Sequence, residues 1–225
     1  MYNPFDHYFT KAKKEGYKAR SAFKLEAIQD KFCIFDKNVH TVIDIGCAPG
    51  SRLQYASKEL QNKAESSPSS TAGQGKQKAM PTSRQAESLA HDDYLIIGFD
   101  IKEVKISLPH VYTYKQDITD RVGVQKILDS HHIQQADCII SDMAPNTIWF
   151  KDIDAIRAFD LLEQSLWMYE ILLKPTGKFV TKVFMWPGFD QYVKRMKDVF
   201  GGKNIKIYKP DASRTQSKET YVIKI

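Results

Sequence analysis

The sequence predicts one α/β domain, residues 1–225, with a seven-stranded, mostly parallel sheet, an antiparallel last strand and helices on both faces. Short β-branched runs alternate with longer amphipathic stretches along the chain, which is the pattern of strand–helix–strand units. Two of these runs carry an acidic residue at or near their ends, as strands of ligand-binding α/β sheets do. The last two runs are separated only by a loop, so we expect them to pair antiparallel.

The first strand, expected at residues 40–45, leads into a tight turn of small residues. The run TVIDI is followed by GCAPG at 46–50. Such a turn lets backbone approach a ligand, and ligands of open α/β sheets bind at the carboxyl ends of the strands. An ordinary turn without a ligand is the alternative, because a glycine-rich turn alone is a weak signal. The turn is neither a G-x-G-x-x-G dinucleotide motif nor a P-loop, since the required glycine and Gly-Lys positions are not matched.

An amphipathic helix is expected before this strand, at residues 18–32, and a second helix directly after the turn, at 51–60. Four residues of the first helix recur at the spacing of a core-facing stripe: Ala22, Leu25, Ile28 and Phe32. The further strands are expected at 94–100, 111–115, 136–141, 178–184, 204–208 and 219–225, and the further helices at 120–131, 154–173 and 189–200. Pro175 and Gly177 are expected to stop the longest of these helices.

Residues 61–92 interrupt the alternation. They are rich in Ser, Gln, Ala, Lys and Gly and poor in large apolar side chains, a composition that cannot offset the entropy of ordering a chain. We therefore expect a disordered insertion inside the domain. A flexible loop of this length adds little closure cost, because that entropy grows only logarithmically.

The composition favours a polyanionic partner and argues against several other classes. The formal net charge is +6 and the pI is about 9.0, which suits nucleic acid, although many basic proteins bind none. The three cysteines lie far apart without a CxxC pair, so we expect neither a zinc site nor a disulfide framework. We expect the protein to act in a reducing compartment. The histidines show no metal-ligand spacing, and no apolar run approaches the roughly 18 residues of a membrane span.

One lysine stands inside a predicted strand. Lys182 has apolar neighbours in the fifth strand, and burying an ammonium is costly unless it is paired. The plain interpretation is a lysine at a sheet edge or one that extends to water. The functional interpretation is a lysine whose pKa falls through desolvation and a nearby second lysine, so that a neutral amine accepts a proton. Asp142, after the fourth strand, and Glu219, which opens the last, would then orient it and offset the charge of Lys24.

Five separated motifs occur in a characteristic order. They are RSAFKL at 20–25, DIGCAPG at 44–50, SDMAPN at 141–146, KVF at 182–184, and a tail with Lys-Pro, Ser-Arg, Ser, Glu and Tyr over 209–221. Together they resemble the FtsJ (RrmJ) family of S-adenosylmethionine-dependent RNA ribose 2′-O-methyltransferases. The resemblance covers nearly the whole chain apart from 61–92, and the third and fifth motifs are unusual in other methyltransferases.

The resemblance implies a Rossmann-like methyltransferase fold, S-adenosyl-L-methionine as methyl donor, S-adenosyl-L-homocysteine as product, and no metal. It implies a tetrad in which Lys182 is the general base toward the ribose hydroxyl and the other three members tune and position it: Lys24, Asp142 and Glu219. The implied cofactor residues are Asp44, Gly46, Pro49, Gly50, Ser51, Arg52, Asp100 at the ribose, Asp117 near the adenine, and Asp142 near the methionine amine. The implied RNA contacts are Lys18, Arg20, Lys24 and Tyr221.

This sequence departs from the family pattern beside the turn. Ser51 and Arg52 stand where the family usually continues with glycine and tryptophan. The aromatic side chain beside the cofactor is therefore replaced by a cation, and Ser51 adds a side chain near the methionine moiety. Gln54 still matches the family.

The expected substrate is a structured RNA: first a uridine of large-subunit ribosomal RNA, naked or in the assembled large subunit, and second a tRNA. One alternative is a small-molecule O-methyltransferase, which would not need Lys18, Arg20 or Lys24. Another is a catalytically weakened factor that binds RNA or the ribosome. We expect a monomer without membrane association. A low-complexity insertion is commoner in eukaryotic chains, which favours the mitochondrion over the cytoplasm.

Overall fold

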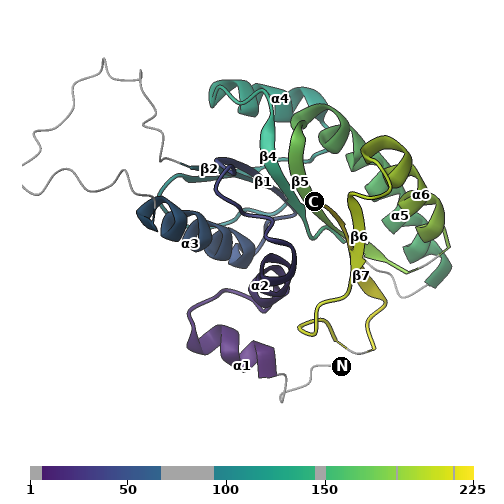
Figure 1. Cartoon of the computed structure of the whole chain (residues 1–225), viewed down its shortest axis with the longest axis horizontal. Helices are drawn as coiled ribbons and strands as arrows, with labels where there is room; N and C mark the ends of the chain where they lie inside the picture. Colours follow the sequence, from purple (N-terminus) through teal and green to yellow (C-terminus); the bar gives the residue numbers. More distant parts are fainter. Residues whose placement is uncertain (1–6, 67–93, 145–150, 186, 215) are drawn as a thin grey trace, which may run out of the picture.

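The computed structural model describes residues 7–66, 94–144, 151–185, 187–214 and 216–225 (Figure 1). Within these ranges the chain forms one seven-stranded sheet in the order β3-β2-β1-β4-β5-β7-β6. The strands are β1 (Thr41–Ile45), β2 (Leu95–Asp100), β3 (Val111–Lys115), β4 (Ala136–Ser141), β5 (Leu173–Phe184), β6 (Ile205–Tyr208) and β7 (Glu219–Lys224). The five strands from β3 to β5 are parallel neighbours, whereas β7 runs antiparallel to both β5 and β6. The predicted fold class and antiparallel final pair are confirmed.

Helices cover both faces of the sheet, because successive side chains of β1 point to opposite faces and both sets are buried. Val42 points into a core shared with α2 (Ser21–Phe32) and α3 (Ser51–Ser66). Ile43 and Ile45 point to the other face, where α4 (Arg121–Ser130), α5 (Lys151–Trp167) and α6 (Phe189–Phe200) pack. In Figure 1 these two groups of helices lie on opposite sides of the sheet. Asp44 shares the face of Val42, because side chains alternate along a strand, so it lies on the side of α3.

The N-terminal part contains a helix that the sequence did not predict, α1 (His7–Lys14). Its Ala12 packs with Phe23 of α2 and Ala212 of the loop before β7. Helix α2 itself begins at Ser21, three residues later than expected. These contacts bring the start of the chain beside the β6–β7 loop.

Two predicted boundaries were wrong at the ends of helices. Helix α3 continues to Ser66, so the first six residues of the expected 61–92 insertion are helical, while 67–92 lie outside the described residues. Helix α5 ends at Trp167 and is followed by a π-helical turn, η2 (Met168–Leu172). The expected single helix over 154–173 is thus an α-helix that begins earlier and closes in a wider turn.

The fifth strand begins at Leu173, well before the expected Lys178, although Pro175 lies inside it. Leu173 pairs with Ala136 and Lys178 pairs with Cys138, with a shift of register between them. The residues around Pro175 therefore fall in a bulge, where a proline costs no ladder hydrogen bond. Lys224 of β7 donates to the carbonyl groups of Pro175 and Gly177. The residues that the sequence alone indicated as the end of a helix therefore lie in a bulge of β5.

Candidate active site

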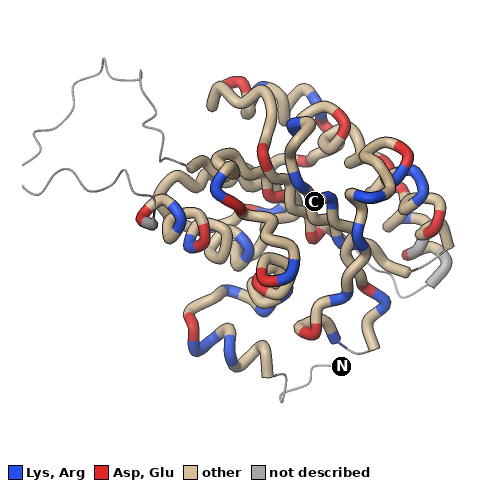
Figure 2. The backbone as a smooth tube through the Cα atoms, viewed as in Figure 1, with Lys and Arg blue, Asp and Glu red and all other residues tan. Residues whose placement is uncertain are grey.

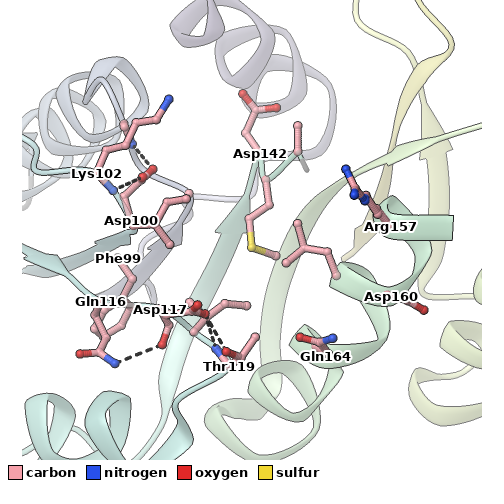
Figure 3. A pocket seen from close by; sticks show the side chains of 17 residues that line it. Phe99, Asp100, Lys102, Gln116, Asp117, Thr119, Asp142, Arg157, Asp160 and Gln164 are labelled. Atoms are coloured by element: carbon pink, nitrogen blue, oxygen red, sulfur yellow. Dashed lines mark hydrogen bonds between the residues drawn. The ribbon is translucent and has the colours of Figure 1, made fainter. Parts of the chain in front are cut away.

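The carboxyl ends of β1, β2 and β4 meet at a cavity of about 640 Å³ (Figure 3). Its walls come from the turn after β1, the ends of β2 and β4, the loop after β3, and one face of α5. The lining residues that carry the argument below are Gly46, Asp100, Asp117, Asp142, Met143 and Arg157. A cavity of this size at this edge of a parallel sheet suits a nucleoside-like ligand.

Two glycines shape the turn beside this cavity. Gly46 has φ +70°, and a Cβ on it would lie 2.9 Å from Cγ of Met143. Gly50 has φ +108°, and a Cβ there would lie 3.1 Å from Cδ1 of Ile106. Glycine adopts such positive φ values at no steric cost. The turn therefore needs glycine for both its backbone conformation and its close packing.

Two carboxylates on the far side of the turn are fixed by backbone groups. Asp100 accepts from the backbone N–H of Ala48 at 2.8 Å and from that of Lys102 at 2.8 Å. Asp117 accepts from the backbone N–H of Thr119 at 2.9 Å and from its hydroxyl at 2.8 Å. Both side chains line the cavity in Figure 3. The loops thus present two oriented carboxylates to a ligand.

Lys182 and Asp142 converge because β4 and β5 are neighbours. Ser141 pairs with Thr181 in the sheet, so the next residue of each strand lies side by side. Nζ of Lys182 donates to the backbone carbonyl of Asp142 at 2.7 Å and lies 3.0 Å from its Oδ1. Lys182 is only 9% exposed. A buried ammonium is therefore paired at two points by one residue, as its burial demands.

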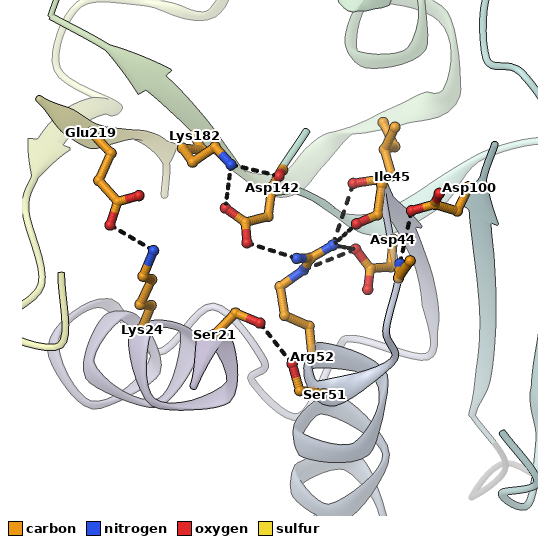
Figure 4. A network of polar contacts seen from close by, with 12 residues as sticks. Ser21, Lys24, Asp44, Ile45, Ser51, Arg52, Asp100, Asp142, Lys182 and Glu219 are labelled. Atoms are coloured by element: carbon orange, nitrogen blue, oxygen red, sulfur yellow. Dashed lines mark hydrogen bonds and ion pairs between the residues drawn. The ribbon is translucent and has the colours of Figure 1, made fainter. Parts of the chain in front are cut away.

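The other two tetrad residues form a second ion pair (Figure 4). Nζ of Lys24, on α2, lies 2.6 Å from Oε1 of Glu219, at the start of β7, and both side chains are 12% exposed. The structure therefore pairs Glu219 with Lys24 and Asp142 with Lys182. Burial would raise the pKa of Asp142, but Lys182, Arg52 and Lys24 outweigh it and hold that pKa well below its usual range. The second pair thus acts on the first through charge.

Arg52 lies under the turn, with only 5% of its surface exposed. Its Nη2 is 2.7 Å from Oδ1 of Asp44, its Nε is 3.1 Å from the same oxygen, and its Nη1 is 2.9 Å from Oδ2 of Asp142. Nη2 also donates to the backbone carbonyl of Gly46. Burial lowers the pKa of Arg52, but Asp44 and Asp142 outweigh it and raise that pKa above its usual value. The guanidinium therefore stays charged and joins β1 to β4.

Not every residue expected at the cofactor lines the cavity. Gly46, Asp100, Asp117 and Asp142 do. Five others are not among the lining residues: Asp44, Pro49, Gly50, Ser51 and Arg52. Ser51 is buried and its Oγ lies 2.6 Å from Oγ of Ser21 on α2. The two departures from the family pattern thus face protein groups.

The residues expected at RNA lie toward α1 and the last loop. The backbone N–H of Lys18 donates to Gln54 at 2.9 Å and its Nζ donates to the carbonyl of Lys105. Arg20 donates to the carbonyl of Ala212. Tyr221 is 4% exposed and its hydroxyl donates to Oδ1 of Asp142 at 3.2 Å. Burial, with Asp142 and Glu219 nearby, raises the pKa of Tyr221 well above its usual value, so this hydroxyl stays protonated.

Sequence reasoning missed the α5 wall of the cavity. Arg157, Asp160, Leu161 and Gln164 line it from one face of that helix (Figure 3). Their spacing of three, four and seven residues was a usable signal, because such residues share a helix face. In the described ranges, no cluster of three His, Cys, Asp or Glu side chains is arranged to hold a metal, and no helix is both long and apolar enough to cross a bilayer.

The fold and the cavity define a class: a mostly parallel α/β protein with a nucleoside-sized site at its strand ends and a buried lysine–carboxylate pair beside it. The chain belongs to the FtsJ-like methyltransferase family, whose sequence model matches residues 17–225. It is therefore a methyltransferase, and family membership implies S-adenosylmethionine as the methyl donor.

Named relatives agree with this assignment, and a solved structure agrees with the fold. The chain is similar to proteins named ribosomal RNA large subunit methyltransferase E. It is 35% identical to the protein of this name from Desulfatibacillum aliphaticivorans, and the match covers 97% of this chain and 88% of the relative. The Acinetobacter baumannii protein of the same name is 34% identical, and the match covers 97% of this chain and 85% of that protein. A solved Plasmodium falciparum structure described as a ribosomal RNA methyltransferase has a TM-score of 0.70 at 20% identity, covering 92% of this chain and 97% of that one. At that identity the likeness speaks to the fold alone.

Proposed function

We propose that this protein methylates a ribose 2′-hydroxyl of large-subunit ribosomal RNA, on a uridine, with S-adenosylmethionine as donor. The observation that carries the proposal is the contact between Lys182 and Asp142 beside the cavity at the strand ends. It combines a candidate base with a site of the right size for the donor. The names of the relatives supply the kind of RNA.

The lining residues suit the donor. Asp100 is the last residue of β2, a position where an acidic residue binds ribose hydroxyls in related nucleotide-binding folds. Its carboxylate is oriented by the backbone N–H groups of Ala48 and Lys102. Asp117 would lie near the adenine, and the methionine end would lie between Gly46 and Asp142. When bound, the donor supplies an electrophilic methyl group on a sulfonium.

The protein's part in the reaction is to orient the hydroxyl and take its proton. Lys182, in its neutral form, would accept the proton of the 2′-hydroxyl as the oxygen bonds to the methyl carbon and the bond between that carbon and sulfur breaks. S-adenosylhomocysteine would leave as the neutral thioether, and Lys182 would end as the ammonium. Asp142 holds Nζ at two points, so the amine cannot swing away. A placed base of this kind contributes roughly 10²–10⁴-fold in rate. Positioning the reacting groups in line contributes roughly 7–11 kcal/mol to lowering the barrier.

Basic side chains near this end support an RNA substrate. Figure 2 shows Lys and Arg along α1 and in the loop between β6 and β7. Lys13, Lys14 and Lys18 are exposed there, and Arg214 is exposed in the loop. Cations on one side of a protein attract the phosphates of nucleic acid. Lys18, Arg20 and Lys24 would contact RNA, with Tyr221 acting through Asp142.

We also propose how the chain is organised and where it acts. It would be a single domain over 1–225 with a low-complexity insertion, acting as a monomer in the mitochondrion. Import of the tagged full chain into mitochondria supports this location, and import into another compartment contradicts it.

The experiment that tests the function is transfer of labelled methyl from S-adenosylmethionine by the purified chain. The substrates are large-subunit ribosomal RNA, the assembled large subunit, tRNA and a catechol. The expected result is a 2′-O-methylated uridine in ribosomal RNA or in the particle. Methylation of tRNA alone, of the catechol alone, or RNA binding without transfer would each overturn the assignment. Comparing stripped RNA with the particle then identifies the natural substrate.

A further inference from the structure

The most unusual side chain of the site is Arg52, which is buried between two carboxylates of different strands. Asp44 is fully buried on β1, and Asp142 follows β4 with its side chain 13% exposed. Arg52 reaches both from the start of α3 (Figure 4). A buried ion pair is costly unless its geometry is good and its remaining donors are satisfied. Arg52 meets this requirement with four of its N–H groups bonded, to Asp44, Gly46 and Asp142.

Asp142 is thereby held from both sides. Its Oδ2 accepts from Arg52, while its Oδ1 faces Lys182 at 3.0 Å and accepts from Tyr221 at 3.2 Å. Its backbone N–H donates to the carbonyl of Ile45 at 3.2 Å. Rotation of this carboxylate would break a contact on one side or the other. The contact of Lys182 with Oδ1 of Asp142 therefore depends on Arg52, whereas its contact with the backbone carbonyl of Asp142 does not.

The charges of the four connected groups balance while Lys182 is protonated, before it gives up a proton to act as the base. Asp44 and Asp142 contribute two negative charges, and Arg52 and Lys182 two positive ones. Removing Arg52 would leave two buried carboxylates with one cation, at the point where a substrate hydroxyl must approach Lys182. The contacts are made from three separate nitrogens of the guanidinium, which spread over two carboxylates and a backbone carbonyl. A lysine ammonium offers its donors from a single nitrogen and lacks this spread.

We propose that Arg52 is a positioning residue that locks the Asp142 carboxylate against Lys182 and joins the cofactor turn to the base. This inference rests on the proposed function, because the position of Lys182 matters for turnover only if Lys182 is the base of that reaction. Arg52 acts through Asp142 and the turn, and its donors are directed at protein groups. The charged or titratable groups facing Asp142 come from five elements: Lys182, Arg52, Lys24, Tyr221 and Asp44.

The first test separates positioning from cofactor binding. In Arg52→Ala the rate constant kcat is expected to fall about 10²-fold, the effect of a misplaced reacting group. The dissociation constant for S-adenosylmethionine, measured by calorimetry, is expected to change by less than about tenfold, the contribution of a single hydrogen bond. Arg52→Lys keeps the charge but lacks the fork, so kcat is expected to stay well below that of the wild type. Wild-type kcat in either variant would overturn the proposal.

The second test is chemical rescue, which has a readout independent of turnover. Guanidinium chloride at low millimolar concentration should fill the space left in Arg52→Ala and raise its melting temperature and kcat, because a ligand stabilises the state that binds it. Ammonium chloride should not. The gain should disappear in Arg52→Ala with Asp142→Asn, since one of the two anchors is lost. Equal effects of the two salts would mean that charge alone matters and would overturn the bridging role.

The matched control is Arg195, another arginine between two carboxylates. Its Nη1 is 2.7 Å from Glu163 and its Nη2 is 3.3 Å from Glu170, but it is half-exposed on α6. Arg195→Ala should keep wild-type kcat and show no gain from guanidinium. A wild-type chain that transfers no methyl group would refute the proposed function, whereas the melting-temperature arm would still decide the role of Arg52. An Arg52→Ala chain indifferent to guanidinium in an active enzyme would refute this inference alone.

Discussion

Nζ of Lys182 is bonded to Asp142 at two points, 2.7 Å from its backbone carbonyl oxygen and 3.0 Å from Oδ1. The first contact fixes the amine relative to the main chain at the end of β4. The second ties it to a carboxylate that Arg52 and Tyr221 also hold. The lysine thus has a defined position before any substrate arrives, which is the property that makes a general base effective.

The first prediction concerns that lysine. Lys182→Met removes the amine, and Lys182→Arg keeps a cation beside Asp142 but offers no group that can lose its proton. Both variants are expected to lower kcat by roughly 10²–10⁴-fold while S-adenosylmethionine still binds, as calorimetry would report. The control is Lys178→Met on the same strand, whose partner is Asp36 at 2.7 Å. Normal turnover in Lys182→Arg would show that charge, and not proton transfer, is the role of this residue.

Much of this arrangement could be predicted because it depends on local pattern. The β-branched run at 41–45 and the small residues after it indicated a buried strand and a tight glycine turn, and the structure has both. A lysine with apolar neighbours at 182 left two interpretations open, one exposed and one buried beside Asp142, and the structure buries it beside Asp142. These inferences need only periodicity and the cost of burying a charge.

The rest depends on contacts between distant parts of the chain. The contact of Arg52 with Asp142 spans 90 residues and exists only because β1 lies beside β4 in the sheet. The early start of β5 was hidden because Pro175 and Gly177 read as a turn, whereas the register shift opposite β4 accommodates them. The α5 wall was missed because the apolar stripe of that helix indicates its core face and says nothing of which cavity its polar face lines.

The second prediction concerns coupling between Lys24 and Glu219. Their 2.6 Å ion pair is mostly shielded from solvent, so removing one partner leaves a poorly solvated charge. Lys24→Met and Glu219→Gln should each lower kcat/KM, and the double variant should lose less than both losses combined. The expected coupling is about 0.5–3 kcal/mol. As a control, the pair Lys11–Glu26, at 3.5 Å and with side chains 35% and 37% exposed, should couple by at most about 1 kcal/mol in unfolding. Additive losses at Lys24 and Glu219 would contradict a joint role.

The third prediction concerns the pH dependence of stability at Asp44. Burial raises the pKa of this carboxyl from 3.8 to about 6, although Arg52 opposes the shift. The folded state therefore binds this proton more tightly than the unfolded state does. The resulting stabilisation is complete below about pH 4 and is lost as the pH rises to about 6. That loss corresponds to about 3 kcal/mol. Asp142 has a lowered pKa, so its stabilisation is lost only as the pH falls below about 4.

Urea unfolding of the wild type and Asp44→Asn between pH 4 and 7.5 measures this. Every other titrating group is common to both proteins, so the difference in free energy of unfolding isolates Asp44. The free energy of unfolding of the variant, relative to that of the wild type, is expected to increase by about 3 kcal/mol as the pH rises. A difference that moves the other way would show that the ion pair with Arg52 outweighs the burial of the carboxylate.

The fourth prediction concerns the charge that would contact RNA. Lys18 is exposed between α1 and α2, and a phosphate contact there would release a counterion on binding. Lys18→Met should weaken RNA binding and reduce the slope of log affinity against log salt by about 0.7–0.9. Lys126 is exposed on α4, across the sheet from α1 and α2, and Lys126→Met should leave the slope unchanged. Equal slopes for both variants would place the RNA elsewhere.

The fifth prediction compares two glycines that share a backbone conformation but not their surroundings. Gly16 has φ +76°, and a Cβ added to it would meet nothing within 4 Å, whereas Gly46 has φ +70° and a Cβ there would lie 2.9 Å from Met143. Gly16→Ala should cost only the strain of a positive φ, about 1–2 kcal/mol. Gly46→Ala should cost more, because the backbone of Met143 also lies 3.2 Å from the new Cβ.

The difference should extend to the cofactor, since Gly46 and Met143 line the cavity and Gly16 does not belong to its walls. Displacing Met143 reshapes the end of the cavity beside Asp142, so Gly46→Ala should weaken S-adenosylmethionine binding by roughly tenfold or more, equal to about 1.4 kcal/mol. Gly16→Ala should bind as the wild type does. Unfolding in urea and calorimetry on the two variants give the two quantities separately. Because the strain is common to both, tight cofactor binding by Gly46→Ala would mean that the turn does not approach the ligand.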